Sequence, residues 1–150
     1  MVPTLEHAKN YQTREAGPTI VFMAISIVQL GQPRKPGEGV RIGTVRRPPR
    51  GVPKSDFAQL DYYDVWFPNV SPTADLVQEA LHAADERAWA AFARKFRHEM
   101  KAPDRSRELD VLAALSHHAN FSVGCYCKDE SRCHRSLLRE LLLERGAAVV

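Results

Sequence analysis

SVGCYCKDESRCHRSLLRELLL, the stretch from Ser122 to Leu143, decides the fold of this chain. An apolar segment, a polar loop and an amphipathic segment follow one another in it. We expect a buried strand over 121–127, a loop over 128–132 and a helix over 133–145. Gly146 would end the helix. A strand followed at once by a helix is typical of a βαβ unit, in which the strands are parallel. The apolar face of the helix would consist of Leu137, Leu138, Leu141 and Leu142.

The rest of the chain contains further strands and helices of the same kind. Residues 19–30 are rich in β-branched side chains and almost continuously apolar, as expected for a central strand covered on both faces. We therefore predict an α/β fold, a single three-layer domain with a largely parallel central sheet flanked by helices. Residues 1–18 would be a flexible N-terminal arm, and residues 19–150 the domain. The other expected elements are strands over 40–45 and 147–150 and helices over 74–83, 85–100 and 105–119.

Two of these helices have a regular apolar face. In the helix over 85–100, large apolar side chains recur at intervals of three and four residues, which predicts packing against the core. In the helix over 105–119, four smaller apolar residues are expected to point inward. The first face comprises Trp89, Phe92, Phe96 and Met100, and the second Leu109, Leu112, Ala113 and Leu115.

The composition limits the classes of protein to which the chain can belong. Its 150 residues suffice for one domain with a core of its own. The formal net charge of +3 is too small to indicate nucleic-acid binding without a local basic patch. The first residues lack the apolar centre of a signal peptide, and the most apolar run, 20–30, is too short to cross a membrane. We therefore expect a cytoplasmic protein with reduced thiols and no membrane partner.

Reactive side chains gather where the strand over 121–127 ends and the next helix begins. Ligand sites in open α/β sheets lie at the carboxyl ends of strands, and unpaired N–H groups at a helix start favour an anion. The helix dipole, Arg132 and Arg135 would lower the pKa of the Cys133 thiol. We therefore expect Cys133 to be a catalytic thiolate and His134 a catalytic acid or base.

A basic segment, RRPPRGVPK over 46–54, directly follows the expected strand over 40–45. If this strand runs parallel to the one over 121–127, the two carboxyl ends open onto the same edge of the sheet. Guanidinium groups, a helix start and a thiol together suit a phosphate, sulfate or carboxylate. We expect a small phosphorylated or nucleotide-like ligand and no cofactor. The anion-binding residues would be Arg46, Arg50, Lys54 and Arg135.

The cysteines also admit other interpretations. They could be small buried hydrophobic residues without a chemical role. Together with His134 they form a set of four ligands that zinc accepts, namely Cys125, Cys127, Cys133 and His134. Against this metal site, the adjacent side chains of Cys133 and His134 would diverge by about 100° at a helix start. Cys127 and Cys133 could instead form a thiol redox switch across the loop.

Two further alternatives concern the loop and the partners of the chain. Residues 127–132 have the C-x4-R form of a rhodanese-like loop, but the loop lacks glycine and places two carboxylates where an anion would bind. A non-enzymatic module could bind nucleic acid through the basic segment, with Tyr62, Tyr63 and Trp66 stacking on bases. The apolar face over 137–143 could pack in the core or against a second copy of the chain, so the sequence is compatible with a monomer or a homodimer.

Four sequence blocks resemble those of the YeaO-like proteins of the domain-of-unknown-function 488 family. The blocks are RIGTVRRPPRGVPK over 41–54, DVWFPNVSPTADL over 64–76, WAAFARKFRHEM over 89–100 and CYCKDESRCHRSLLRELL over 125–142. The resemblance implies a compact cytoplasmic α/β domain and no established activity. The signature positions that it implies are Arg46, Arg50, Gly51, Lys54, Cys125, Cys133, His134 and Arg135.

The chain departs from the pattern of that family at three positions. Val45 stands where the family has an aspartate, and Pro48 where it has a tryptophan. Cys127 replaces a glutamate that the wider family has two residues after the first cysteine. Any role that the family assigns to these three side chains therefore does not carry over to this chain.

Overall fold

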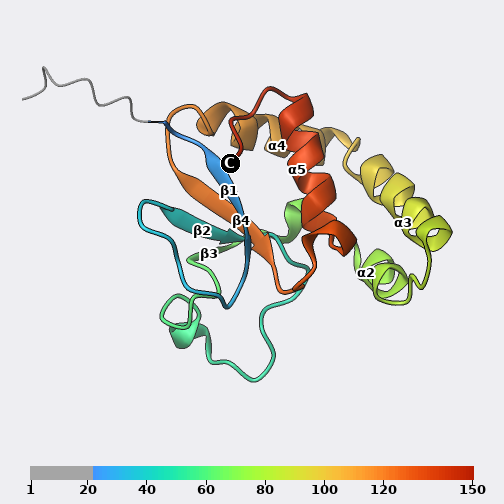
Figure 1. Cartoon of the computed structure of the whole chain (residues 1–150), viewed down its shortest axis with the longest axis horizontal. Coiled ribbons are helices and arrows are strands. Elements are labelled where there is room, and N and C mark those ends of the chain that lie inside the picture. Colours follow the sequence, from blue (N-terminus) through green and yellow to red (C-terminus); the bar gives the residue numbers. More distant parts are fainter. Residues whose placement is uncertain (1–21) are drawn as a thin grey trace, which may run out of the picture.

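A four-stranded, entirely parallel sheet forms the centre of the described structure (Figure 1). The computed structural model describes residues 22–150, so the expected arm over 1–18 lies outside the described residues. The spatial order of the strands is β1-β4-β2-β3. The α/β fold class and the parallel sheet predicted from the sequence are thus confirmed. The strand bounds are β1 Ile25–Gln29, β2 Val40–Gly43, β3 Val65–Trp66 and β4 Phe121–Cys125.

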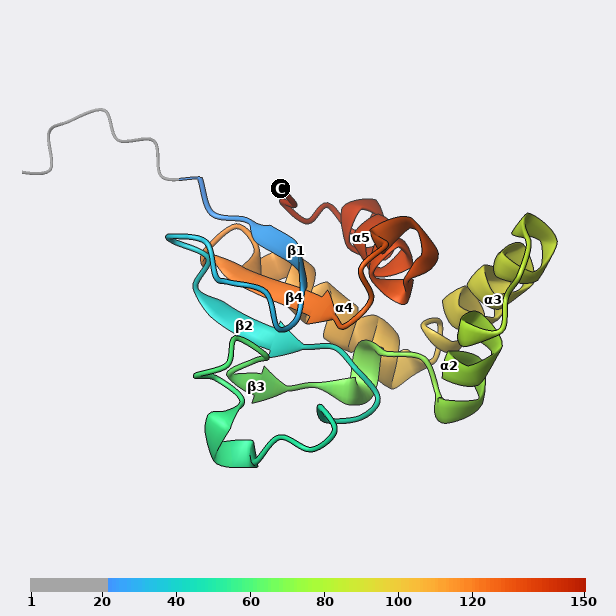
Figure 2. The same ribbon diagram turned by 60° about the horizontal axis from the view of Figure 1, so that its bottom comes forward.

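Residues 22–150 contain four α-helices, and the segments between these elements contain three short 3-10 helices. Helices α4 and α5 pack against each other over the sheet, whereas α2 and α3 lie together beside the carboxyl ends of the strands (Figure 2). The α-helices are α2 Ala74–Leu81, α3 Glu86–Glu99, α4 Pro103–Leu115 and α5 His134–Glu144. The 3-10 helices are η1 Lys54–Asp56, η2 Pro68–Val70 and η3 Glu130–Arg132.

The main core lies between the helices and one face of the sheet. Alternate residues of the strands point to this face, as the period of a strand requires. The aromatic face predicted for α3 contributes Phe92 and Phe96, both fully buried. The apolar face predicted for α5 is confirmed, since Leu137, Leu138, Leu141 and Leu142 are all buried. The strand residues in this core are Ile25, Ile27, Ile42, Phe121 and Val123.

The opposite face of the sheet is covered by segments that contain no α-helix, and two glycines within the strands have no room for a Cβ atom. A Cβ atom at Gly43 would lie 2.3 Å from the ring of Tyr63. A Cβ atom at Gly124 would lie 2.6 Å from the carbonyl oxygen of Val28. These distances are too short for a side chain, so a larger residue at either position would have to displace its neighbour. This layer completes a three-layer arrangement.

The structure corrects several expected element ends. Strand β4 ends at Cys125, two residues earlier than expected. Helix α4 begins at Pro103, two residues earlier than expected, because the missing N–H of proline costs nothing at a helix start. Leu115 at the end of α4 is 47% exposed and does not point inward. In place of a last strand, the chain end forms an isolated parallel bridge between Val149 and Ile25. Gly146 ends α5 with a φ of 80°, as expected.

Candidate functional site

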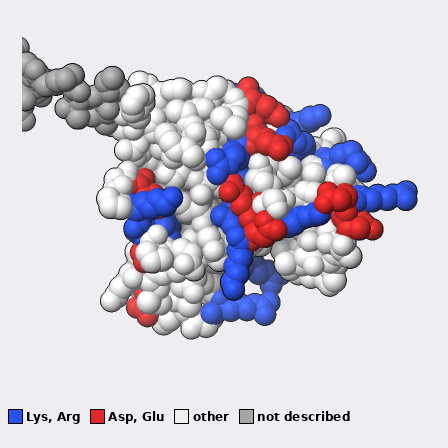
Figure 3. Space-filling view, in the orientation of Figure 1, with Lys and Arg blue, Asp and Glu red and all other residues white. Residues whose placement is uncertain are grey.

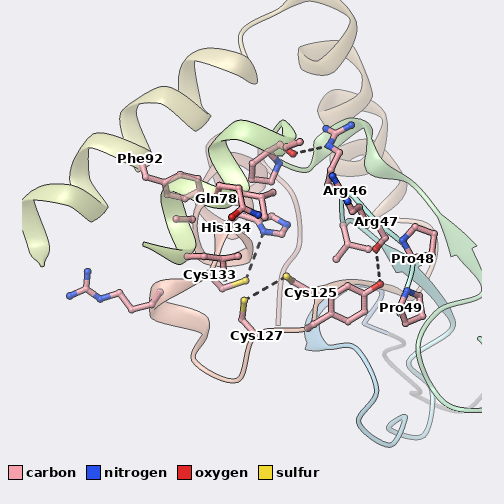
Figure 4. A pocket seen from close by; sticks show the side chains of 18 of the residues that line it. Arg46, Arg47, Pro48, Pro49, Gln78, Phe92, Cys125, Cys127, Cys133 and His134 are labelled. Atoms are coloured by element: carbon pink, nitrogen blue, oxygen red, sulfur yellow. Dashed lines mark hydrogen bonds between the residues drawn. The ribbon is translucent and has the colours of Figure 1, made fainter. Parts of the chain in front are cut away.

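Three cysteines and one histidine meet at the carboxyl edge of the sheet (Figure 4). Cys125 is the last residue of β4, and Cys133 caps the amino end of α5, whose first residue is His134. Cys127 lies in the loop between these two elements. The parallel order of the sheet therefore brings the sequence-predicted sulfur and imidazole groups together. We call Cys125, Cys127, Cys133 and His134 the Cys–His cluster.

The side chains of the Cys–His cluster converge within contact distance. The Cys125 thiol donates toward Cys127 Sγ, with 3.9 Å between the sulfurs, and Cys133 Sγ is 3.9 Å from His134 Nδ1. The sulfur atoms of Cys125 and Cys133 and one ring nitrogen of His134 all lie within 4.8 Å of one another. The expectation that Cys133 and His134 diverge is wrong, because Cys133 has an extended backbone (φ −125°, ψ 147°) and precedes the first helical turn. These three buried residues could hold a soft metal ion.

A backbone carbonyl fixes the orientation of the His134 ring. His134 Nε2 lies 2.7 Å from the oxygen of Thr44, the residue that follows β2. Because a carbonyl oxygen only accepts, Nε2 must donate, and Nδ1 faces Cys133 Sγ. Burial lowers the pKa of His134 to about 4, so the ring is neutral at pH 7. The edge of the ring also contacts Phe96, with 5.9 Å between the ring centroids.

The three thiols differ in how readily they lose a proton. The pKa of Cys127 is lowered, because the thiols of Cys125 and Cys133 donate hydrogen bonds to its sulfur. The pKa of Cys133 is raised by its interactions with the thiols of Cys125 and Cys127 and by the burial of its side chain. This direction is opposite to the one expected from the position of Cys133 at a helix start. Of the three thiols, Cys127 is therefore the one that loses its proton most readily, and it is also the least buried.

A cavity of about 630 Å³ opens beside the Cys–His cluster. All four residues of the cluster line it. The basic segment that follows β2 forms a second side, and α2 and α3 contribute a third, mostly apolar side. The lining residues from the basic segment include Arg46, Arg47, Pro48, Pro49 and Arg50, and those from α2 and α3 include Val77, Gln78, Ala80 and Phe92. The structure therefore brings the basic segment and the cysteines to one cavity.

The four predicted anion-binding residues have different environments. The Arg46 guanidinium donates to the carbonyl oxygens of Pro72, Pro68 and Ser71 at 2.9, 3.2 and 3.1 Å, so it holds two loops together. Figure 4 shows this side chain extending away from the sulfur atoms. Arg50 lines the cavity and is exposed. Lys54 lies in η1 and does not line the cavity.

Arg135 is buried and binds the backbone of the cysteine loop, the segment over 126–132 between β4 and α5. Its Nη2 donates to the carbonyl oxygens of Cys127 and Lys128 at 2.5 and 3.3 Å. Its Nε has no hydrogen-bond partner among the described residues. Arg135 therefore fixes the position of Cys127, and its guanidinium does not line the cavity.

The structure adds site residues that the sequence interpretation did not select. Arg47 lines the cavity, is exposed and has no side-chain partner within residues 22–150. Its backbone oxygen accepts a hydrogen bond from the hydroxyl of Tyr126 at 2.9 Å, which ties the basic segment to the cysteine loop. Gln78 and Asp75 reach the cavity from α2. The presence of Arg47 beside Arg46 was a visible signal, whereas nothing in the sequence of α2 indicated that it lies at this edge.

The fold and the site together define a class of protein. It is a parallel α/β domain with cysteine, histidine and arginine side chains at the carboxyl edge of its sheet. The chain matches the family model DUF488-N3a, described as the active DUF488-N3 subclade, over residues 25–146, and it belongs to this family. The resemblance to the domain-of-unknown-function 488 family inferred from the four sequence blocks is thus confirmed. No curated protein and no solved structure matches the chain. No helix within residues 22–150 is both long and apolar enough to span a membrane.

Proposed function

We propose that this protein is an enzyme that binds a small phosphorylated or nucleotide-like molecule in the cavity and acts on it with the Cys–His cluster. One observation carries the proposal: Arg47 and Arg50, whose guanidinium groups have no partner within residues 22–150, line the same cavity as the Cys–His cluster. A cationic side would hold the anionic group of the substrate, and the cluster would meet its reacting atoms. The description of the family as an active subclade agrees with catalysis.

The size and lining of the cavity support a nucleotide-sized ligand. A volume of about 630 Å³ lies within the usual range of small-molecule sites, ~300–1,000 Å³. Guanidinium groups bind phosphate through paired hydrogen bonds, and the apolar side chains of Val77 and Ala80 would contact a ring. The amide of Gln78 can donate and accept hydrogen bonds, as a nucleobase edge requires. A cytoplasmic location would keep the three thiols reduced, as the proposed chemistry requires.

The aromatic residues that would stack on nucleic acid are mostly engaged elsewhere. Tyr63 is 4% exposed, and Tyr62 packs edge-on against Tyr126 with 6.2 Å between the ring centroids. Of the three aromatic residues considered, Trp66 alone has a substantially exposed side chain. On the face shown in Figure 3, basic and acidic side chains are interspersed. These observations favour a small ligand over a nucleic-acid strand.

Substitution of Arg47 and Arg50 tests the proposal. We expect wild-type protein to bind inorganic phosphate and nucleoside phosphates in calorimetric titrations. The double variant Arg47→Ala/Arg50→Ala should bind them at least tenfold more weakly, a loss of about 1.4 kcal/mol. Arg94→Ala removes an exposed arginine of α3 that does not line the cavity and should bind like wild type. Equal affinities for the double variant and wild type, or no binding by wild type, would refute the proposal.

A further inference from the structure

We propose that Cys125, Cys133 and His134 bind a Zn²⁺ ion whose fourth coordination position faces the cavity. The three donor atoms come from two separate segments, the end of β4 and the start of α5. Zinc accepts thiolate and imidazole ligands, and sites with three protein ligands leave one position for water or a substrate atom. The metal site stands on the geometry of the cluster. A use of its open position in the reaction rests on the proposed function.

The donor atoms are already close to tetrahedral spacing. With zinc–sulfur bonds of about 2.3 Å and zinc–nitrogen bonds of about 2.0–2.1 Å, two ligand atoms of a tetrahedral site are roughly 3.5–3.8 Å apart. Cys133 Sγ and His134 Nδ1 are 3.9 Å apart, and no two of the three donor atoms are more than 4.8 Å apart. All three side chains are less than 10% exposed. Small side-chain rotations would therefore suffice to close them around an ion.

The surroundings of His134 resemble the outer shell of a metal ligand. A metal-binding histidine usually donates its second ring N–H to a carbonyl or carboxylate, which fixes the tautomer and the direction of the free nitrogen. Here Nε2 donates to the oxygen of Thr44 at 2.7 Å, so the lone pair of Nδ1 is directed toward the sulfurs. The hydroxyl of Thr44 in turn donates to the oxygen of Gly124 at 3.0 Å. The acceptor is therefore itself anchored to the strand that carries Cys125.

Cys127 lies beside this group and lines the same cavity. Its sulfur is 3.9 Å from Cys125 Sγ, but it does not belong to the set of donor atoms within 4.8 Å of one another. The residue lines the cavity and is half-buried, and Arg135 holds its carbonyl oxygen. These features place Cys127 beside the open coordination position. We accordingly expect metal binding to continue without the Cys127 sulfur.

Metal analysis of the full chain tests this inference. Protein purified without chelator should contain close to one zinc per chain by mass spectrometry. After removal of zinc, Co²⁺ should produce the visible bands of a tetrahedral ion and a sulfur-to-cobalt charge-transfer band. Cys133→Ser and His134→Gln should lose at least nine tenths of the bound metal, whereas Cys127→Ser should keep it. His117→Gln, which changes an exposed histidine outside the cluster, is the matched control.

The outcomes separate this inference from the proposed function. Wild-type protein that neither contains zinc nor binds Co²⁺ would overturn the metal site, whatever the folding of the variants. Loss of metal in Cys127→Ser would also overturn it, because the fourth ligand would then come from the protein. Circular dichroism identifies any variant that loses metal by unfolding. Metal content should be unchanged in Arg47→Ala/Arg50→Ala, so weak phosphate binding in that variant would leave the metal result standing.

Discussion

His134 Nε2 and the carbonyl oxygen of Thr44 are 2.7 Å apart, and this hydrogen bond joins the start of α5 to the end of β2. The two residues are 90 positions apart in the sequence. The bond closes the edge of the sheet on which the basic segment and the cysteines meet. It also determines which ring nitrogen faces the sulfurs. One backbone acceptor therefore sets both the packing of the edge and the chemistry of the cluster.

Two substitutions of His134 should distinguish the contribution of its hydrogen bond to stability from that of the packing of its ring. In chelator-treated protein, His134→Ala removes a buried donor and leaves a cavity, so we expect the free energy of unfolding to fall by about 2–4 kcal/mol. His134→Gln keeps an N–H in a position similar to Nε2 and should recover at least half of that loss. Urea unfolding followed by circular dichroism measures both changes. Equal losses in the two variants would show that the bond to Thr44 contributes little.

Acid should weaken the attachment of the segment before β3. Hydrogen bonds from Arg34 lower the pKa of Asp64, which also accepts the backbone N–H of Arg41. A carboxylate with a lowered pKa stabilises the fold above its unfolded pKa of about 3.9, and this contribution is lost as the pH falls toward the folded value. Asp64→Asn should therefore reduce the pH dependence of the free energy of unfolding below pH ~4. An unchanged slope in that range would contradict the assignment. Because Asp64 is partly exposed, the change should be modest.

The central part of the fold was accessible from sequence because its signals are local. The leucine spacing predicted the buried face of α5, and the immediate succession of strand and helix predicted parallel pairing. Parallel pairing then placed the carboxyl ends of β2 and β4 side by side. The meeting of the basic segment with the cysteines therefore followed from topology.

The environments of individual site residues depend on segments that are distant in the sequence, so they could not be predicted from the sequence. Arg46 was predicted to bind an anion, but carbonyl groups of residues 68–72 surround its guanidinium. The low thiol pKa was expected at Cys133 and occurs at Cys127, because neighbouring sulfurs outweigh the helix start. Sequence periodicity contains no information about such long-range contacts. Whether Cys133, His134, Arg50 and Lys54 act on a substrate stays a prediction.

Replacement of Gly43 by alanine should cost less stability when Tyr63 is also replaced. A Cβ atom at this position would lie 2.3 Å from the Tyr63 ring, so Gly43→Ala must displace a buried side chain. Overpacking of this kind costs about 1–3 kcal/mol. The double variant Gly43→Ala/Tyr63→Ala should lose less free energy of unfolding than the two single variants lose together, by at least ~0.5 kcal/mol. Thermal unfolding of the four proteins measures the coupling, and strictly additive losses would exclude the contact.

Arg135 should control the opening of the cysteine loop. Arg135 is 4% exposed, and its guanidinium donates to the carbonyl oxygens of Cys127 and Lys128. Arg135→Met keeps the apolar stem of the side chain and removes both bonds. We expect amide hydrogen exchange over residues 126–132 to become at least tenfold faster, about 1.4 kcal/mol of local stability. Arg145→Met removes an arginine at the other end of α5, where it contacts Asp110 and Leu141, and should leave this loop unchanged. Equal exchange rates in Arg135→Met and wild type would mean that the loop is held by its own turns and by the Tyr126 hydroxyl bond to Arg47.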